Sequence, residues 1–207
     1  PETIWLAEAF TRPAMMHGLG KVGFQQSYTY YAWRNEKWDL ESYCQELARD
    51  SAHYMRPSFW PTTHDILPPY LQHGGVAGFA VRAVLAATSC PTWGIYSGYE
   101  FVENEPRGTY QEPNNNEKYE FRPRRWEDAE PIGISRLFTL LNAARTKHPA
   151  LRQLLAQAAQ TIHSRAGWLN GTREFPNTRT SELPVSPEGE RAINGAPPFW
   201  QRYLPFW

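Results

Sequence analysis

The stretch SFWPTTHDILPPYLQHGGVAGFAVRAVLAATSCPTWGIYSG, residues 58–98, decides the fold class of this chain. Its first part, Ser58–Thr63, is short and rich in aromatic and β-branched residues, which is typical of a buried strand. Gly78–Ser89 is almost entirely apolar and indicates a buried helix, and Thr92–Gly98 has strand composition again. A strand, a helix and a second strand in this order predict two parallel strands joined by a right-handed crossover.

The same alternation extends on both sides of this stretch, so that residues 3–151 contain four predicted βα units. A complete (β/α)₈ barrel needs about 250 residues. The pattern therefore fits half of such a barrel or a small open α/β sheet, and it does not choose between them. The remaining predicted strands are Thr3–Ala9 and Gln26–Trp33, and the remaining predicted helices are Met15–Val22, Lys37–Tyr54 and Ile134–Lys147.

Charge and cysteine content exclude several classes of protein. Lys plus Arg and Asp plus Glu each total 21, so the chain carries no net charge that would favour nucleic acid or an anionic membrane as a partner. No apolar run reaches the roughly 18 residues of a membrane span. Cys44 and Cys90 have no metal-binding spacing and predict reduced thiols in a cytoplasmic protein. Nine Trp, eleven Tyr and ten Phe fit either a large core or a site that stacks sugar rings.

Two segments fall outside the βα pattern. Residues 103–128 form a long polar insert between the last strand and the last helix, and a loop of this length is usually functional or disordered. Residues 153–160 could extend a helix, whereas residues 164–207 show no sustained period and are expected to be irregular. The chain begins at Pro1, which predicts a processed product or a piece of a longer protein.

Acidic residues follow three of the predicted strands, at the end where barrel enzymes carry their catalytic groups. Glu8 follows the first strand, the pair His64 and Asp65 follows the third, and Tyr99 and Glu100 follow the fourth. A structural ion pair with Arg12 or Arg34 would also explain such acids. Two carboxyls two units apart, however, are what cleavage of a glycosidic bond requires, one as the acid and one as a nucleophile or base.

The neighbours of Glu8 favour the acid role, because the apolar Trp5, Leu6 and Phe10 would favour its protonated form. His64 is expected to bind a sugar hydroxyl, although a buried core histidine would also fit. The six histidines show no metal-ligand spacing, and no metal site is expected. Motifs of nucleotide-binding proteins and of serine hydrolases are absent from the sequence.

At these residues the chain resembles a known family. LAEAFTRPAMMHGLGKVGFQQSYTYYAWR (residues 6–34) and FWPTTHDILPPYLQHGG (residues 59–75) are similar to the fifth- and seventh-strand segments of the α-1,4-glucan:maltose-1-phosphate maltosyltransferases, which are members of the α-amylase superfamily. Residues 78–104, 116–126 and 141–154 continue the resemblance. It covers roughly residues 3–155, and the strings EAFTRPAMMH and EKYEFRPR are its most specific parts.

The resemblance implies a role for each candidate site residue. Glu8 stands at the position of the general acid/base, and Asp65 at that of the carboxylate that stabilises the oxocarbenium-like transition state. Lys118 and Tyr119 match a pair that helps to bind the maltosyl phosphate. The family nucleophile is an Asp upstream of Glu8, before the start of this chain. No cofactor is implied.

The resemblance also implies an architecture and partners. Residues 1–155 are expected to be the second half, strands five to eight, of a (β/α)₈ barrel, and residues 156–207 an irregular tail. The resemblance is expected to fade near residues 161–163, through either a change of reading frame or a divergent terminus. Implied substrates are α-maltose 1-phosphate and an α-1,4-glucan, for a parent enzyme that could be a homodimer. Alternatives are an amylase or trehalose-forming isomerase, or a glucan-binding or non-functional remnant.

Overall fold

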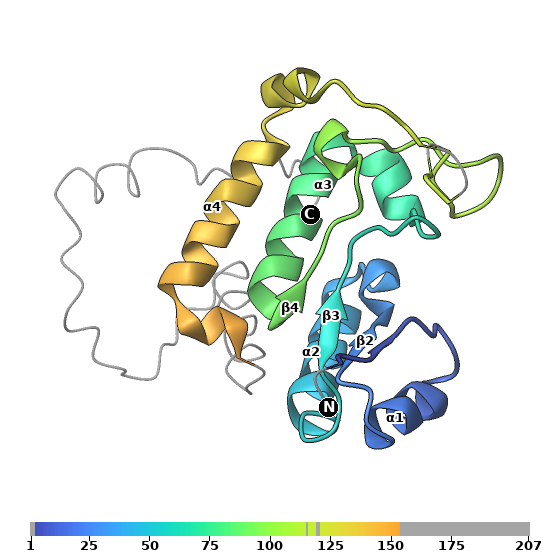
Figure 1. Ribbon diagram of the computed structural model, residues 1–207, viewed down its shortest axis with the longest axis vertical. Helices are drawn as coiled ribbons and strands as arrows, with labels where there is room; N and C mark the ends of the chain where they lie inside the picture. Colours follow the sequence, from blue (N-terminus) through green and yellow to red (C-terminus); the bar gives the residue numbers. More distant parts are fainter. Residues whose placement is uncertain (1–2, 115, 119–120, 154–207) are drawn as a thin grey trace, which may run out of the picture. The chain divides into compact units, whose positions relative to one another are not determined.

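The computed structural model describes residues 3–114, 116–118 and 121–153. These residues belong to the first of two units of the chain, Pro1–Ala166, and the second, Gly167–Trp207, lies outside the described residues. Four strands form one parallel sheet in the order β1-β2-β3-β4 (Figure 1). The predicted α/β class with parallel strands is therefore confirmed. The strands are β1 (Leu6–Ala7), β2 (Gln26–Tyr28), β3 (Pro57–Phe59) and β4 (Thr92–Trp93).

One α-helix follows each strand along the chain, as the sequence predicts. α4 has the bounds that were predicted for it, and the other helices differ at their ends. The α-helices are α1 (Pro13–Lys21), α2 (Lys37–Arg49), α3 (Pro69–Ser89) and α4 (Ile134–Lys147). The 3₁₀ helices are η1 (Tyr30–Trp33), η2 (Tyr99–Phe101), η3 (Trp126–Asp128), η4 (Glu130–Ile132) and η5 (Pro149–Arg152).

The strands are shorter than predicted, and for β2 a local cap accounts for the early end. The predicted strand over Gln26–Trp33 stops at Tyr28, because Thr29 caps the following 3₁₀ helix. The Thr29 hydroxyl accepts the backbone N–H of Tyr31 at 3.4 Å and donates to the carbonyl of Ser58 at 3.1 Å. A residue type that favours strands thus starts a helical turn, and it also links β2 to β3.

Helix α3 begins at Pro69 rather than at Gly78, the start that the sequence predicted. Proline suits the first turn of a helix, where its missing N–H costs nothing. Gly75 then takes φ 54° and ψ −159°, which breaks the helical geometry within α3. A residue with a side chain would be strained at this position, so the kink in α3 requires Gly75.

Two apolar clusters form the core. The first surrounds Tyr31 and Phe59, whose rings stack with centroids 4.4 Å apart, and it contains Cys44 and Cys90. Both thiols are free, and burial raises the pKa of Cys44 to about 12. The second cluster packs α3 against α4, which lie side by side in Figure 1. Among the described residues, no helix is both long enough and apolar enough to span a membrane.

Candidate functional site

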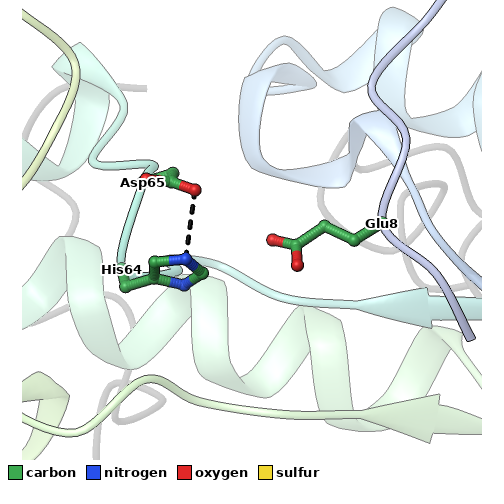
Figure 2. A group of neighbouring side chains, drawn as sticks. All are labelled: Glu8, His64 and Asp65. Carbon is green, nitrogen blue, oxygen red and sulfur yellow. Dashed lines mark ion pairs between the residues drawn. The ribbon is translucent and has the colours of Figure 1, made fainter. Parts of the chain in front are cut away.

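Three of the predicted site residues meet at one place. Glu8, His64 and Asp65 each offer an oxygen or nitrogen atom, and these atoms all lie within 4.8 Å of one another. Figure 2 shows the Glu8 carboxylate pointing across from its own segment toward the His64 and Asp65 side chains. The predicted juxtaposition of Glu8 and Asp65 is therefore present, and the catalytic roles of the two residues stay predictions.

Sheet geometry explains the meeting. Ala7 at the end of β1 pairs with Ser27 of β2, which pairs in turn with Pro57 of β3. Glu8 follows β1 directly, and the chain leaves β3 after Phe59 to reach His64 and Asp65. Because the strands are parallel, both segments emerge at the same edge of the sheet.

A tight turn fixes the backbone position of Asp65. The backbone N–H of Asp65 donates to the hydroxyl of Thr63 at 3.1 Å. Thr63 and Ile66 exchange two backbone hydrogen bonds of 3.0 and 3.3 Å around it. Thr63 and Ile66 are buried, so the turn is anchored while the Asp65 side chain remains 40% exposed at the site.

Two nitrogen groups flank the Asp65 carboxylate. The His64 Nε2 atom lies 3.1 Å from Asp65 Oδ2, and the Lys118 ammonium forms an ion pair with Asp65 Oδ1. The Lys118 Nζ atom also lies 3.7 Å from an oxygen of Glu112. Lys118, predicted on separate grounds, thus joins the site from the long loop. Tyr119, its predicted companion, lies outside the described residues.

The apolar sequence neighbours of Glu8 do not bury its side chain. Glu8 is exposed, and Trp5 and Leu6 are 57% and 56% exposed. β1 has a hydrogen-bonded neighbour on one side only among residues 3–114, 116–118 and 121–153, namely β2. Apolar neighbours in sequence do not desolvate a carboxyl unless a second element covers them.

Two tyrosines near the site were not among the predicted site residues. Burial, and secondarily the charge of Glu8, raise the pKa of Tyr28 at the end of β2. Burial also raises the pKa of Tyr96, whose ring centroid lies 6.3 Å from that of His64. A weak signal was present in the sequence, because Tyr28 and Tyr96 both lie within predicted strands.

An aromatic cleft lies on the segments that follow β1 and β2. It is lined by Phe10, Pro13, Tyr30, Trp33 and Arg34. The rings of Phe10 and Trp33 meet edge to face with centroids 5.2 Å apart, and Trp33 donates its indole N–H to Gln111 at 2.9 Å. The cleft combines aromatic rings with the charged Arg34 side chain, and Phe10 lies two residues after Glu8 in the sequence.

Glu8, His64 and Asp65 also carry the atom types of metal ligands. Their chemistry argues for another occupant, because the Lys118 ammonium already pairs with Asp65 and would repel a metal cation. An ammonium beside two carboxylates and an imidazole fits a ligand that carries hydroxyls and an anionic group.

Parallel βα units with two carboxyls converging beyond the strand ends fit the class of enzymes that act on glycosidic bonds. The sequence is 58% identical over 154 residues to the α-1,4-glucan:maltose-1-phosphate maltosyltransferase of Arcanobacterium haemolyticum, an alignment that covers 74% of this chain and 22% of that protein. It is 57% identical over 157 residues to maltosyltransferase 2 of Streptomyces coelicolor, with 74% and 24% covered. The predicted resemblance is confirmed. No protein-family model matches the chain.

A third relative extends the similarity. The α-1,4-glucan:maltose-1-phosphate maltosyltransferase of Cereibacter sphaeroides is 40% identical over 208 residues, which cover 99% of this chain and 31% of that protein. For this relative, the expectation that the resemblance ends near residues 161–163 is wrong. This chain spans between about a fifth and a third of the length of these relatives.

Proposed function

We propose that the protein containing this sequence is a retaining maltosyltransferase, which moves maltosyl units from α-maltose 1-phosphate to the non-reducing end of an α-1,4-glucan. The observation that carries the proposal is the convergence of Glu8, His64 and Asp65 within 4.8 Å, in a chain that is 58% identical to a maltosyltransferase over 154 residues. Retention is what the resemblance implies, because the family nucleophile, expected upstream of Glu8, forms a covalent intermediate with the sugar.

Each site residue has a proposed task in two displacements. In the first, a carboxylate nucleophile, expected upstream of Glu8, bonds to the anomeric carbon as the bond to phosphate breaks, and Glu8 gives its proton to the leaving phosphate. In the second, the acceptor hydroxyl attacks that carbon, the bond to the enzyme breaks, and Glu8 takes the hydroxyl proton. The Asp65 charge stabilises the cationic transition states, while His64, Lys118 and Tyr119 hold the sugar and its phosphate.

The proposed architecture is that β1 to β4 are strands five to eight of a (β/α)₈ barrel. Its support is the parallel order β1-β2-β3-β4 and the grouping of site residues beyond the strand ends. Residues 1–155 would then be part of the catalytic domain, with 156–207 as a separate C-terminal segment. A cytoplasmic location and a homodimer remain predictions.

The test uses the full-length protein that contains this sequence. It should release inorganic phosphate from α-maltose 1-phosphate when an α-1,4-glucan is present, and the glucan should grow by two glucose units at a time. Glu8→Gln should lower the rate about 10²–10⁴-fold, the usual loss for a general acid/base. Glu127→Gln, at a side chain that is 69% exposed, is the matched control. Near-full activity of Glu8→Gln would refute the assignment, and starch hydrolysis without phosphate release would favour an amylase.

A further inference from the structure

Arg124 lies at the centre of a cluster next to the site. Its guanidinium donates to both oxygens of Glu103, from Nε at 2.7 Å and from Nη2 at 2.9 Å. Its Nη1 atom lies 3.2 Å from Glu117 Oε1 and 3.2 Å from the Ser97 hydroxyl. The Arg124 side chain is only 7% exposed. We call Ser97, Glu103, Glu117 and Arg124 the Arg124 cluster.

The backbone of Gly98 packs closely against the Arg124 cluster. Gly98, at φ 103°, lies directly under it, and a Cβ there would come within 3.0 Å of the Glu103 carboxylate. The backbone of Gly98 must therefore pass where only glycine fits. A fork of two parallel hydrogen bonds fixes the orientation of both partners, which a single contact does not. The pKa of Arg124 is raised, first by its hydrogen bonds to Glu103, so its charge is secure.

The cluster controls the position of the residue before Lys118. Glu117 is held twice, by its side chain through Arg124 and by its backbone N–H, which donates to the Tyr96 hydroxyl at 2.6 Å. Lys118 follows at once and forms the ion pair with Asp65. Glu103 begins the long loop and Glu117 lies near its far part, so Arg124 joins two points that are separated by fourteen residues of chain.

We propose that Arg124 is a positioning residue that, by holding Glu103 and Glu117, places the Lys118 ammonium beside Asp65 and so supports binding of the phosphorylated donor sugar. The proposal rests on the proposed function, in which Lys118 binds the maltosyl phosphate. A purely structural ion cluster would stabilise the loop equally, but its loss would not act through Lys118. That difference makes the two interpretations separable.

The experiment measures the Kd of α-maltose 1-phosphate by calorimetry in the full-length protein, with Glu8→Gln present to prevent turnover. Arg124→Met and Lys118→Met are compared singly and together. We expect Arg124→Met to weaken binding about 10–100-fold, the scale of loss when a site is displaced by about 1 Å. In the presence of Lys118→Met it should have little further effect. The control is Arg125→Met, since the neighbouring Arg125 side chain is 77% exposed.

The experiment distinguishes failure of the positioning role from failure of the proposed function. Unchanged donor affinity in Arg124→Met, or an equal loss in the Lys118→Met background, would overturn the positioning role. If Arg124→Met does not fold, Glu117→Gln is measured in the same cycle, because it keeps the side-chain shape while removing its charge. Failure of the parent protein to bind α-maltose 1-phosphate would overturn the proposed function itself. When Glu8 is left unchanged, Arg124→Met should raise the KM for α-maltose 1-phosphate more than the KM for the glucan.

Discussion

Replacing Gly94 with alanine should destabilise the protein by about 1–3 kcal/mol, the usual cost of forcing one more carbon into a packed region. The three atoms nearest to a Cβ at Gly94 all belong to the Trp60 ring, each within 3.0 Å. That ring is held in place, because it donates its indole N–H to Ser58 Oγ at 2.9 Å and packs against Tyr28 at 5.3 Å between centroids. The added carbon therefore displaces the ring or the backbone of β4.

The assay is urea unfolding of the full-length protein followed by far-UV circular dichroism, with the free energy of unfolding compared between variants. Gly18→Ala is the matched control, because it lies within α1 and its new Cβ would meet nothing within 4 Å. It should stabilise the protein by about 0.5–1 kcal/mol. The clashing atoms belong to the benzene half of the indole, so Trp60→Phe should reduce the cost of Gly94→Ala. An equal cost in both backgrounds, or none at all, would refute the packing argument.

Three more predictions test other parts of the molecule. Arg145→Met should lower the free energy of unfolding, measured by urea titration, by about 3 kcal/mol, because the buried guanidinium donates to the carbonyls of Cys90 at 2.9 Å and of Leu151 at 2.8 Å. Arg136→Met, at an exposed side chain, is the control and should change the free energy of unfolding little. Equal effects of the two substitutions would contradict the argument. The free energy of unfolding should fall as the pH rises above about 9. Burial raises the pKa of Cys44 from 9.0 to about 12, so the thiol of the unfolded chain loses its proton at a lower pH than the folded one. A urea midpoint of unfolding that stays constant from pH 8 to pH 11 would contradict this prediction. Asp65→Asn should lower the maltosyl-transfer rate about 10²–10³-fold, as loss of a stabilising charge does, and an unchanged kcat would remove Asp65 from the mechanism.

Periodicity predicted the fold well where a helix carries its own signal. The apolar face of residues 134–147 gave both ends of α4, because no glycine or proline interrupts it. It failed at α3, where Gly74 and Gly75 hid a kinked first segment. The strand over residues 26–33 was predicted too long, because the sequence does not reveal that Thr29 caps a 3₁₀ turn rather than continuing β2. The hydroxyl that caps the turn also donates to the carbonyl of Ser58 in β3, and this contact between distant residues is set by the tertiary structure.

Some features of the candidate site could likewise be predicted from the sequence, and others could not. Strand ends located Glu8, His64 and Asp65, since parallel strands bring their carboxyl ends to one edge. The exposure of Glu8 could not be predicted, because it depends on what covers β1 rather than on neighbours in sequence. Lys118 came from the resemblance alone, since a lysine in a long polar loop has no local signal. The partners of Arg124 were equally hidden, because Glu103 and Arg124 are distant in sequence.

The candidate site therefore depends on two supports of different kinds. Glu8, His64 and Asp65 are set by the register of a parallel sheet, in which neighbouring strands constrain one another through the backbone. Lys118 comes from a loop that the side chains of the Arg124 cluster hold. Most single substitutions leave the backbone register of a sheet unchanged. A single substitution in a side-chain cluster removes the contacts that hold its members in place. Substitutions in the cluster should therefore change donor affinity at nearly constant kcat, and those that disturb the strand ends, such as Gly94→Ala directly after β4, should change stability and rate together.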